Sequence, residues 1–273
     1  MEIGIFARTF PGNDPAAVLA AVRDAGYGTA QFNLACAGLA SMPDAVPDDA
    51  IAAIAAARAS TGVTLCALSG TYNMAHPDAA VRAAGLERLA VVIAAAARLK
   101  IPLVTLCTGS RDPLDQWAHH PDNADPSAWS DMAAEMEKAL VLAESAGVDL
   151  GIEPEQANVV TSADDAVRLI GDMGSQRLRI VLDPANLFER ASPDEARDIV
   201  ARAVDTTAGQ VALAHAKDRD AAGRFVAAGR GVVDFPQFCT RLAATGFSGA
   251  LVTHGLEAAE AASVAAFLRS VAP

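Results

Sequence analysis

Four residues that can bind a divalent metal stand at the ends of successive apolar runs in the second half of the sequence. They are Glu153, Asp183, His215 and His254. Carboxylate oxygens and imidazole nitrogens together suit Mn, Zn, Co or Fe, whereas Mg prefers oxygen ligands. Each residue alone has an ordinary structural explanation, such as a turn cap or a hydrogen-bonded histidine. Four in succession instead predict one metal site, if the fold brings the ends of the runs together.

The fold that does this is one in which short strands and helices alternate. Runs rich in β-branched and other apolar residues are predicted as strands at residues 3–7, 29–33, 63–69, 103–107, 148–153, 178–183, 210–215 and 250–253. Ala-rich helical stretches follow them, beginning near Asp14, Pro47, Asp78, Pro126, Ser162, Ser192, Asp234 and Glu257. Several of these starts carry the Asp, Ser or Pro that is typical of helix N-termini.

Strand–helix units that repeat without a linker indicate a single-domain α/β protein. We predict a (β/α)₈ TIM barrel over residues 1–273, with the active site at the carboxyl ends of the strands. The links after the strands are longer than those before them and hold most of the His, Trp and Asn residues, as expected for functional loops. No GxGxxG sequence follows the first strand, which argues against a doubly wound open sheet.

Composition narrows the class of protein and its partners. The chain has 273 residues, of which 52% are hydrophobic and 20% charged, as is typical of a folded globular protein. Its net charge of −12 predicts that it binds neither nucleic acid nor an anionic membrane. The first residues lack a signal-peptide pattern and no apolar run approaches the ~20 residues that span a bilayer, so we expect a cytoplasmic protein. The four cysteines have no CxxC spacing and are expected to be reduced.

Several motifs, taken in order, resemble those of a known family. They are residues 69–78 (SGTYNMAHPD), 108–112 (TGSRD), 152–154 (IEP), 182–186 (LDPAN), 215–218 (HAKD) and 229–235 (GRGVVDF). Over nearly its whole length the chain resembles the xylose isomerase-like barrel superfamily of sugar and sugar-phosphate isomerases and epimerases. The resemblance implies that Glu153, Asp183 and His215 bind one divalent metal. It also implies that glutamates after strands five and eight flank the substrate as acid and base.

The sequence departs from this family pattern at two positions. His254 follows the last strand, where the family usually has a glutamate. An imidazole can still give a nitrogen to the metal, but a metal-bound imidazole is a poor proton acceptor, which weakens the case for a symmetric two-glutamate mechanism. Asn186 stands where some relatives carry a substrate-facing histidine. An amide binds a hydroxyl without exchanging a proton.

The remaining candidates are assigned to catalysis or to substrate binding. Glu153 is the expected base, and His76 is a second acid, base or hydroxyl ligand, with a loop-stabilising hydrogen bond as the equal alternative. Lys217 is expected to stabilise an enediolate oxygen rather than simply to pair with Asp218. The expected substrate-binding residues are Asn73, Asn186, Arg230 and Trp117. For the last two, a solvated loop side chain and local packing are the competing interpretations.

These residues predict an enzyme, namely a divalent-metal-dependent isomerase or epimerase of a sugar, sugar phosphate or related polyol that acts through an enediolate. The expected cofactor is one Mn ion, or alternatively Zn, Co or Fe. The expected partner is a small-molecule carbohydrate, and a homo-oligomer is left open. One alternative is a metal-assisted dehydratase, lyase or hydrolase on a similar substrate, and another is a catalytically degenerate barrel that binds sugar. Because imidazoles bind metal only when neutral, affinity is expected to fall below about pH 6.

Overall fold

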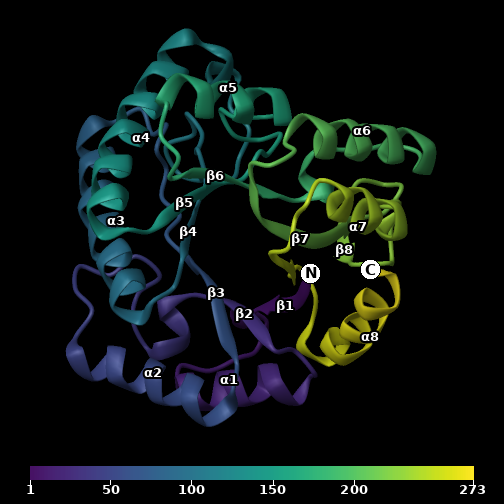
Figure 1. Cartoon of the computed structure of the whole chain (residues 1–273). Helices are drawn as coiled ribbons and strands as arrows, with labels where there is room; N and C mark the ends of the chain where they lie inside the picture. Colours follow the sequence, from purple (N-terminus) through teal and green to yellow (C-terminus); the bar gives the residue numbers. More distant parts are fainter.

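A computed structural model of the chain, residues 1–273, shows a closed barrel of parallel strands encircled by helices (Figure 1). The barrel strands are β1 (Glu2–Phe6), β2 (Thr29–Phe32), β3 (Thr64–Ser69), β4 (Leu103–Leu106), β5 (Asp149–Ile152), β6 (Leu178–Leu182), β7 (Val211–Arg219) and β9 (Ala250–Thr253). Each strand from β1 to β6 pairs with the next, β1 also pairs with β9, and β9 pairs with β7. The pairing of β6 with β7 closes the ring, so the predicted TIM barrel is confirmed.

The helices cover the outside of the barrel and begin close to the predicted residues. They are α1 (Pro15–Asp24), α2 (Asp48–Thr61), α3 (Ala79–Leu99), α4 (Pro126–Ala146), α5 (Ala163–Met173), α6 (Pro193–Thr206), α7 (Phe235–Ala244) and α8 (Ala261–Val271). Side-chain caps explain the agreement, because Asp14 and Asp78 accept hydrogen bonds from the backbone N–H two residues further on. A short 3₁₀ turn, Ala258–Glu260, precedes α8 and moves its start beyond Glu257.

Packed side chains fill the interior of the barrel. A buried cluster joins residues of five strands: Ala67, Leu103, Val181, Leu213, Ala250 and Val252. Side chains two residues apart on a strand point to the same face. The next inward layer therefore contains Ser69, Thr105, Asp183, His215 and His254. A layer of polar and ionisable side chains directly on top of an apolar one marks the carboxyl end of the barrel as the site of chemistry.

The seventh strand is longer than the sequence indicates. His215 was predicted to close it, but β7 continues to Arg219, so that prediction is wrong. The reason is an antiparallel hairpin: residues 217–219 pair with β8 (Phe225–Ala227) above the rim of the barrel. Asp218 is fully buried and accepts the backbone N–H groups of Gly229, Gly231 and Val233, which folds the following segment back onto the strand.

Two further expectations concern membranes and cysteines. None of the helices combines the length and apolar character needed to cross a membrane. All four cysteines are free thiols, and Cys36, Cys107 and Cys239 are buried in the core. Burial raises the pKa of the Cys239 thiol to about 11, so this group behaves as a small apolar side chain.

Candidate metal centre

The structure brings the four predicted metal ligands together at one point of the barrel mouth. One ligand atom from each of Glu153, Asp183, His215 and His254 lies within 4.8 Å of the others. The side chains come from the neighbouring strands β5, β6, β7 and β9, or from the residue that follows the strand. Two carboxylates and two imidazoles in one small space are a set that fits a divalent cation of the Mn, Fe, Co or Zn type.

Asp183 lies at the centre of the group. Its Oδ2 atom is 3.0 Å from Nε2 of His254 and 3.7 Å from Nδ1 of His215. The other carboxylate oxygen, Oδ1, accepts the backbone N–H of Ala185 at 2.9 Å, as the cap of a short 3₁₀ turn. Nδ1 of His215 also lies 3.2 Å from Oε1 of Glu153. One oxygen of Asp183 is thus fixed by the backbone, and the other faces both imidazoles.

Burial and close charges set different pKa values for the two imidazoles. Burial disfavours the charged form of His215, but Glu153 and Asp183 outweigh it and raise the pKa of His215 to about 9. Burial and the nearby His215 charge instead lower the pKa of His254. Burial also opposes ionisation of Asp183, yet Lys217 and the two imidazoles hold its pKa well below the usual value. Without a metal, the site therefore contains a charged His215 and a neutral His254 at neutral pH.

An amide connects the lysine to the glutamate. Asn186 accepts a hydrogen bond of 2.7 Å from Nζ of Lys217 and donates one of 2.7 Å to Oε1 of Glu153. The ammonium also lies 3.3 Å from Oδ2 of Asp183. Lys217 pairs with this carboxylate rather than with Asp218, whose oxygens accept backbone N–H groups. Because Asn186 is buried, the link holds one oxygen of Glu153 in place.

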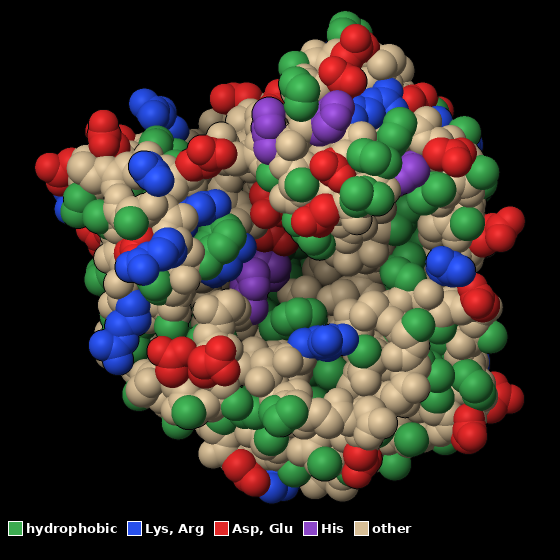
Figure 2. All heavy atoms as spheres, turned by 180° about the vertical axis from the view of Figure 1, so that it is seen from behind, with side chains coloured by type: hydrophobic (Ala, Val, Ile, Leu, Met, Phe, Trp, Pro, Cys, Tyr) green, Lys and Arg blue, Asp and Glu red, His purple; other side chains and the backbone are tan.

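A cavity of about 370 Å³ opens above these residues. Figure 2 shows a hollow at this end of the barrel with histidine side chains at its bottom. The lining residues are Phe6, Gln31, Asn33, Ser69, Thr71, Thr105, Trp117, Glu153, Glu155, Asn186, His215, Lys217, Phe225 and His254. Trp117 and Phe225 are only half buried, so they present aromatic surface at the rim. A cavity of this size with convergent polar groups suits a small polar ligand.

Several lining residues were not singled out in the sequence. Phe225 belongs to the hairpin, and its ring lies 4.1 Å from Nζ of Lys217 and 3.9 Å from the guanidinium carbon of Arg219. Glu155 is a second carboxylate in the cavity, and burial together with the charge of Glu153 raises its pKa to about 7. Gln31 lies inside β2, where a long polar side chain between the apolar residues Ala30 and Phe32 was the available signal.

Three residues that were predicted to bind substrate or to act as acid or base do not line this cavity. Nδ1 of His76 accepts the backbone N–H of Asp78 at 3.0 Å, and its Nε2 lies 3.3 Å from the carbonyl oxygen of Pro113. Arg230 lines a different hollow of about 540 Å³, beside the hairpin. Asn73 lines a third, and its Oδ1 accepts the backbone N–H of Ser110 at 3.0 Å. The roles given to these residues stay predictions.

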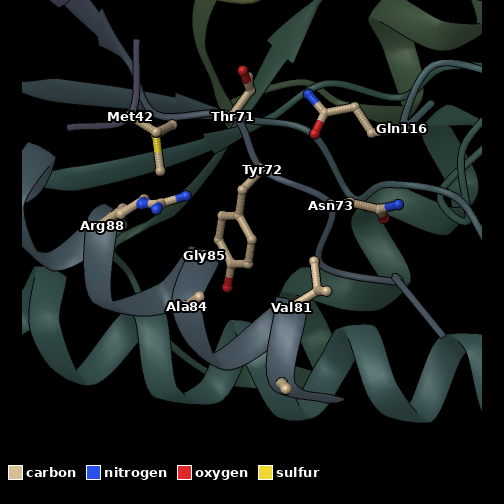
Figure 3. A pocket seen from close by; sticks show the side chains of 10 residues that line it. Met42, Thr71, Tyr72, Asn73, Val81, Ala84, Gly85, Arg88 and Gln116 are labelled. Atoms are coloured by element: carbon tan, nitrogen blue, oxygen red, sulfur yellow. The ribbon is translucent and has the colours of Figure 1, made fainter. Parts of the chain in front are cut away.

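Figure 3 shows the side chains that line the hollow with Asn73, among them Tyr72 and residues of α3. This hollow has a volume of about 550 Å³ and shares Thr71 with the cavity described above. The ring of Tyr72 packs against α3 at Gly85, where an added Cβ would lie 2.1 Å from a ring carbon. A residue without a side chain is therefore required at this point of the helix.

The fold and the site define a single-barrel protein with a metal-type ligand cluster at the carboxyl end of its strands. The chain belongs to the xylose isomerase-like TIM barrel family, whose sequence profile matches residues 19–271. None of the curated proteins compared with the chain matches its sequence.

Solved structures of low sequence identity have the same fold. 3-Keto-D-glucoside 4-epimerase YcjR from E. coli has 17% identity and a TM-score of 0.77, with 99% of each chain covered. L-Ribulose 3-epimerase has 21% identity and a TM-score of 0.75, covering 98% of this chain and 92% of that one. D-Psicose 3-epimerase from Clostridium cellulolyticum H10, in a structure with D-tagatose, has 16% identity and a TM-score of 0.77, with 99% of each chain covered. At these identities the likeness establishes the fold.

Proposed function

We propose that the protein is a divalent-metal-dependent isomerase or epimerase of a sugar or related polyol. The observation that carries the proposal is the convergence of four metal-type ligand atoms within 4.8 Å, from residues of which three line a cavity of about 370 Å³. Membership of the xylose isomerase-like family and the fold shared with sugar epimerases support the same class of reaction. Manganese is the metal we expect, with Zn, Co or Fe as alternatives, and a cytoplasmic location stays a prediction.

Glu153, Asp183, His215 and His254 would hold the cation. When bound, it would supply Lewis-acid chemistry, which lowers the pKa of a C–H group between two coordinated substrate oxygens. Glu153 is then the base, because one of its oxygens accepts a hydrogen bond from Asn186 while the other accepts none from the protein. That free oxygen takes the substrate proton. The ammonium of Lys217 stabilises the oxyanion of the resulting enediolate from the cavity wall.

The replacement of a glutamate by His254 bears on the type of reaction. His254 faces Asp183 within the proposed metal site, with Nε2 3.0 Å from Oδ2, so it does not take the place of a second carboxylate base. This favours a route in which Glu153 moves the proton alone, as in a one-base isomerisation. The same observation supports the second candidate, a metal-assisted dehydratase, lyase or hydrolase on a similar substrate.

Solvent-deuterium exchange tests the proposal. The Mn-loaded protein is incubated in D₂O with D-psicose, D-tagatose, L-ribulose and their phosphates, and deuterium at the carbon next to the carbonyl is measured by NMR. We expect exchange in wild type, loss of exchange by at least about 100-fold in Glu153→Gln, and retention in Glu257→Gln. Glu257 is a matched control because it follows the last strand but does not line the cavity. Equal exchange in wild type and Glu153→Gln would reject Glu153 as the base, and release of water or a cleavage product without exchange would favour the second candidate.

A further inference from the structure

A glutamine from the opposite side of the barrel contacts one of the two metal-site imidazoles. Oε1 of Gln31, on β2, lies 2.8 Å from Nε2 of His215, on β7. Gln31 is only 6% exposed and belongs to the inward layer, where branched aliphatic side chains are the usual choice. A buried amide is costly unless it is hydrogen-bonded, so its placement calls for an explanation.

Hydrogen bonds at the other end of the amide define its orientation. Nε2 of Gln31 lies 3.2 Å from Oγ of Ser69 and 3.3 Å from Oγ1 of Thr105, on the next two strands. Two hydroxyl oxygens accept the two N–H groups of the amide, and this arrangement turns its carbonyl oxygen toward His215. A carbonyl oxygen only accepts hydrogen bonds. Nε2 of His215 must therefore carry a proton.

This proton decides which atom of His215 can bind a metal. A neutral imidazole has one protonated nitrogen and one free lone pair. With the proton on Nε2, the lone pair is on Nδ1, and Nδ1 is the atom that faces Glu153 at 3.2 Å and Asp183 at 3.7 Å. His254 contrasts with this arrangement, since its Nε2 faces Asp183 and its Nδ1 has no hydrogen-bond partner in the protein.

We propose that Gln31 is a positioning residue that keeps the proton of neutral His215 on Nε2, so that Nδ1 is the metal-binding atom. The inference rests on the proposed metal site, and it adds to that site the residue that orients the His215 ring. Ser69 and Thr105 act through Gln31, by fixing the direction of the amide. Partners of this kind behind a metal-bound histidine typically change metal affinity by about 10- to 100-fold when removed.

The test uses the full-length protein labelled with ¹⁵N at histidine and loaded with Zn²⁺. Two-bond ¹H–¹⁵N correlation spectra identify the protonated nitrogen of each ring, and five histidines are few enough to assign by substitution. Zinc affinity is measured by competition with a chelator. Gln31→Met removes the amide at similar length, and Gln31→Glu keeps an acceptor opposite Nε2. Gln156→Met is the matched control, because Gln156 makes comparable amide hydrogen bonds to the carbonyl oxygens of Thr161 and Leu187 outside the cavity.

We expect wild type to show His215 protonated on Nε2 and bound through Nδ1. Gln31→Met should bind zinc about 10- to 100-fold more weakly, and the proton of its His215 should no longer be confined to Nε2. Gln31→Glu and Gln156→Met should keep Nδ1 coordination. Coordination through Nε2 in wild type, or unchanged affinity and spectrum in Gln31→Met, would overturn the proposal. If wild type binds no zinc, the proposed function loses its metal, and the spectrum of the metal-free protein at about pH 10 still decides where the proton of His215 lies.

Discussion

The two halves of the barrel mouth differ in charge although they belong to the same layer of the same barrel. In the half formed by β5, β6, β7 and β9, the inward residues are Glu153, Asp183, His215 and His254. In the half formed by β1 to β4, they are Phe6, Gln31, Ser69 and Thr105. The comparison teaches that one half supplies the ionisable groups and that the other half, apart from Phe6, supplies neutral hydrogen-bonding groups, of which Gln31 orients His215.

Physical reasons favour this division. Ionisable side chains that lie close together in a buried space perturb one another strongly, as the opposite pKa shifts of His215 and His254 demonstrate. Another carboxylate or cation opposite them would change the charge that the metal must balance. Amide and hydroxyl groups satisfy a buried donor or acceptor without adding charge. Gln31 meets this requirement, because its amide accepts from His215 and donates to two hydroxyls.

Removing Asp183, the central carboxylate of the half formed by β5, β6, β7 and β9, should have the largest effect on metal content and stability. Asp183→Ala leaves the buried Lys217 ammonium and both imidazoles without their shared partner. We expect complete loss of bound metal and a stability loss of about 3–5 kcal/mol in the metal-free protein. Elemental analysis and urea unfolding measure the two effects. Asp218→Asn is the control, since Asp218 is equally buried but binds backbone N–H groups, and it should keep the metal. Equal metal content in Asp183→Ala and wild type would show that the metal does not bind at the group of Glu153, Asp183, His215 and His254.

Metal affinity should keep rising to a higher pH than it would for a site with an unperturbed imidazole, whose pKa is ~6.5. Because the pKa of His215 is raised to about 9, the metal-free site holds a proton at pH 7 that the metal must displace. Affinity should therefore rise about tenfold per pH unit between pH 7 and about 9 and level off above it. The same shift stabilises the metal-free fold below the unfolded pKa of ~6.5, and this stabilisation is lost as the pH rises through about 9. Calorimetry in buffers of different ionisation enthalpy should show about one proton released per metal at pH 7. Release of no proton would contradict the raised pKa.

Substitutions of His254 test whether its imidazole is a metal ligand. His254→Ala should weaken metal binding by about 10- to 100-fold, because one donor is lost and Oδ2 of Asp183 loses a partner 3.0 Å away. His254→Glu should retain metal and shift preference toward Mn, since a carboxylate is a harder ligand than imidazole. Competition between Mn and Zn for each variant measures this shift. An Ala variant with wild-type affinity would leave a three-ligand site and favour the hydrolase or dehydratase alternative.

The smallest effect on metal affinity is expected from substitutions in the half of the mouth formed by β1 to β4. Ser69→Ala and Thr105→Val each remove one of the two acceptors of the Gln31 amide and leave the other. Each should weaken metal binding only a few-fold, consistent with about 1 kcal/mol for one neutral hydrogen bond. The double variant should approach Gln31→Met because the amide is then free to turn. A double variant indistinguishable from wild type would show that the hydroxyls do not fix the amide.

The sequence predicted the barrel and the grouping of Glu153, Asp183, His215 and His254 because both depend on short-range patterns. Apolar runs and helix caps such as Asp14 and Ser192 are local signals, and an ionisable residue at the end of a strand is conspicuous against an apolar interior. The hairpin was missed because β8 has three residues and pairs with a continuation of β7 that contains Lys217 and Asp218. Gln31 was missed because its function depends on His215, which is distant in sequence and meets it only across the closed barrel.

A crystal structure of the metal-loaded protein, with anomalous scattering recorded on both sides of the metal absorption edge, tests the central claim most directly. The account predicts one anomalous peak per chain, about 2.0–2.3 Å from an oxygen of Glu153 and of Asp183 and from a nitrogen of His215 and of His254. The nitrogen of His215 should be Nδ1, with Nε2 still bonded to Gln31. A peak elsewhere, or no peak after loading with Mn or Zn, would contradict the division of the mouth into a metal-binding half and an orienting half.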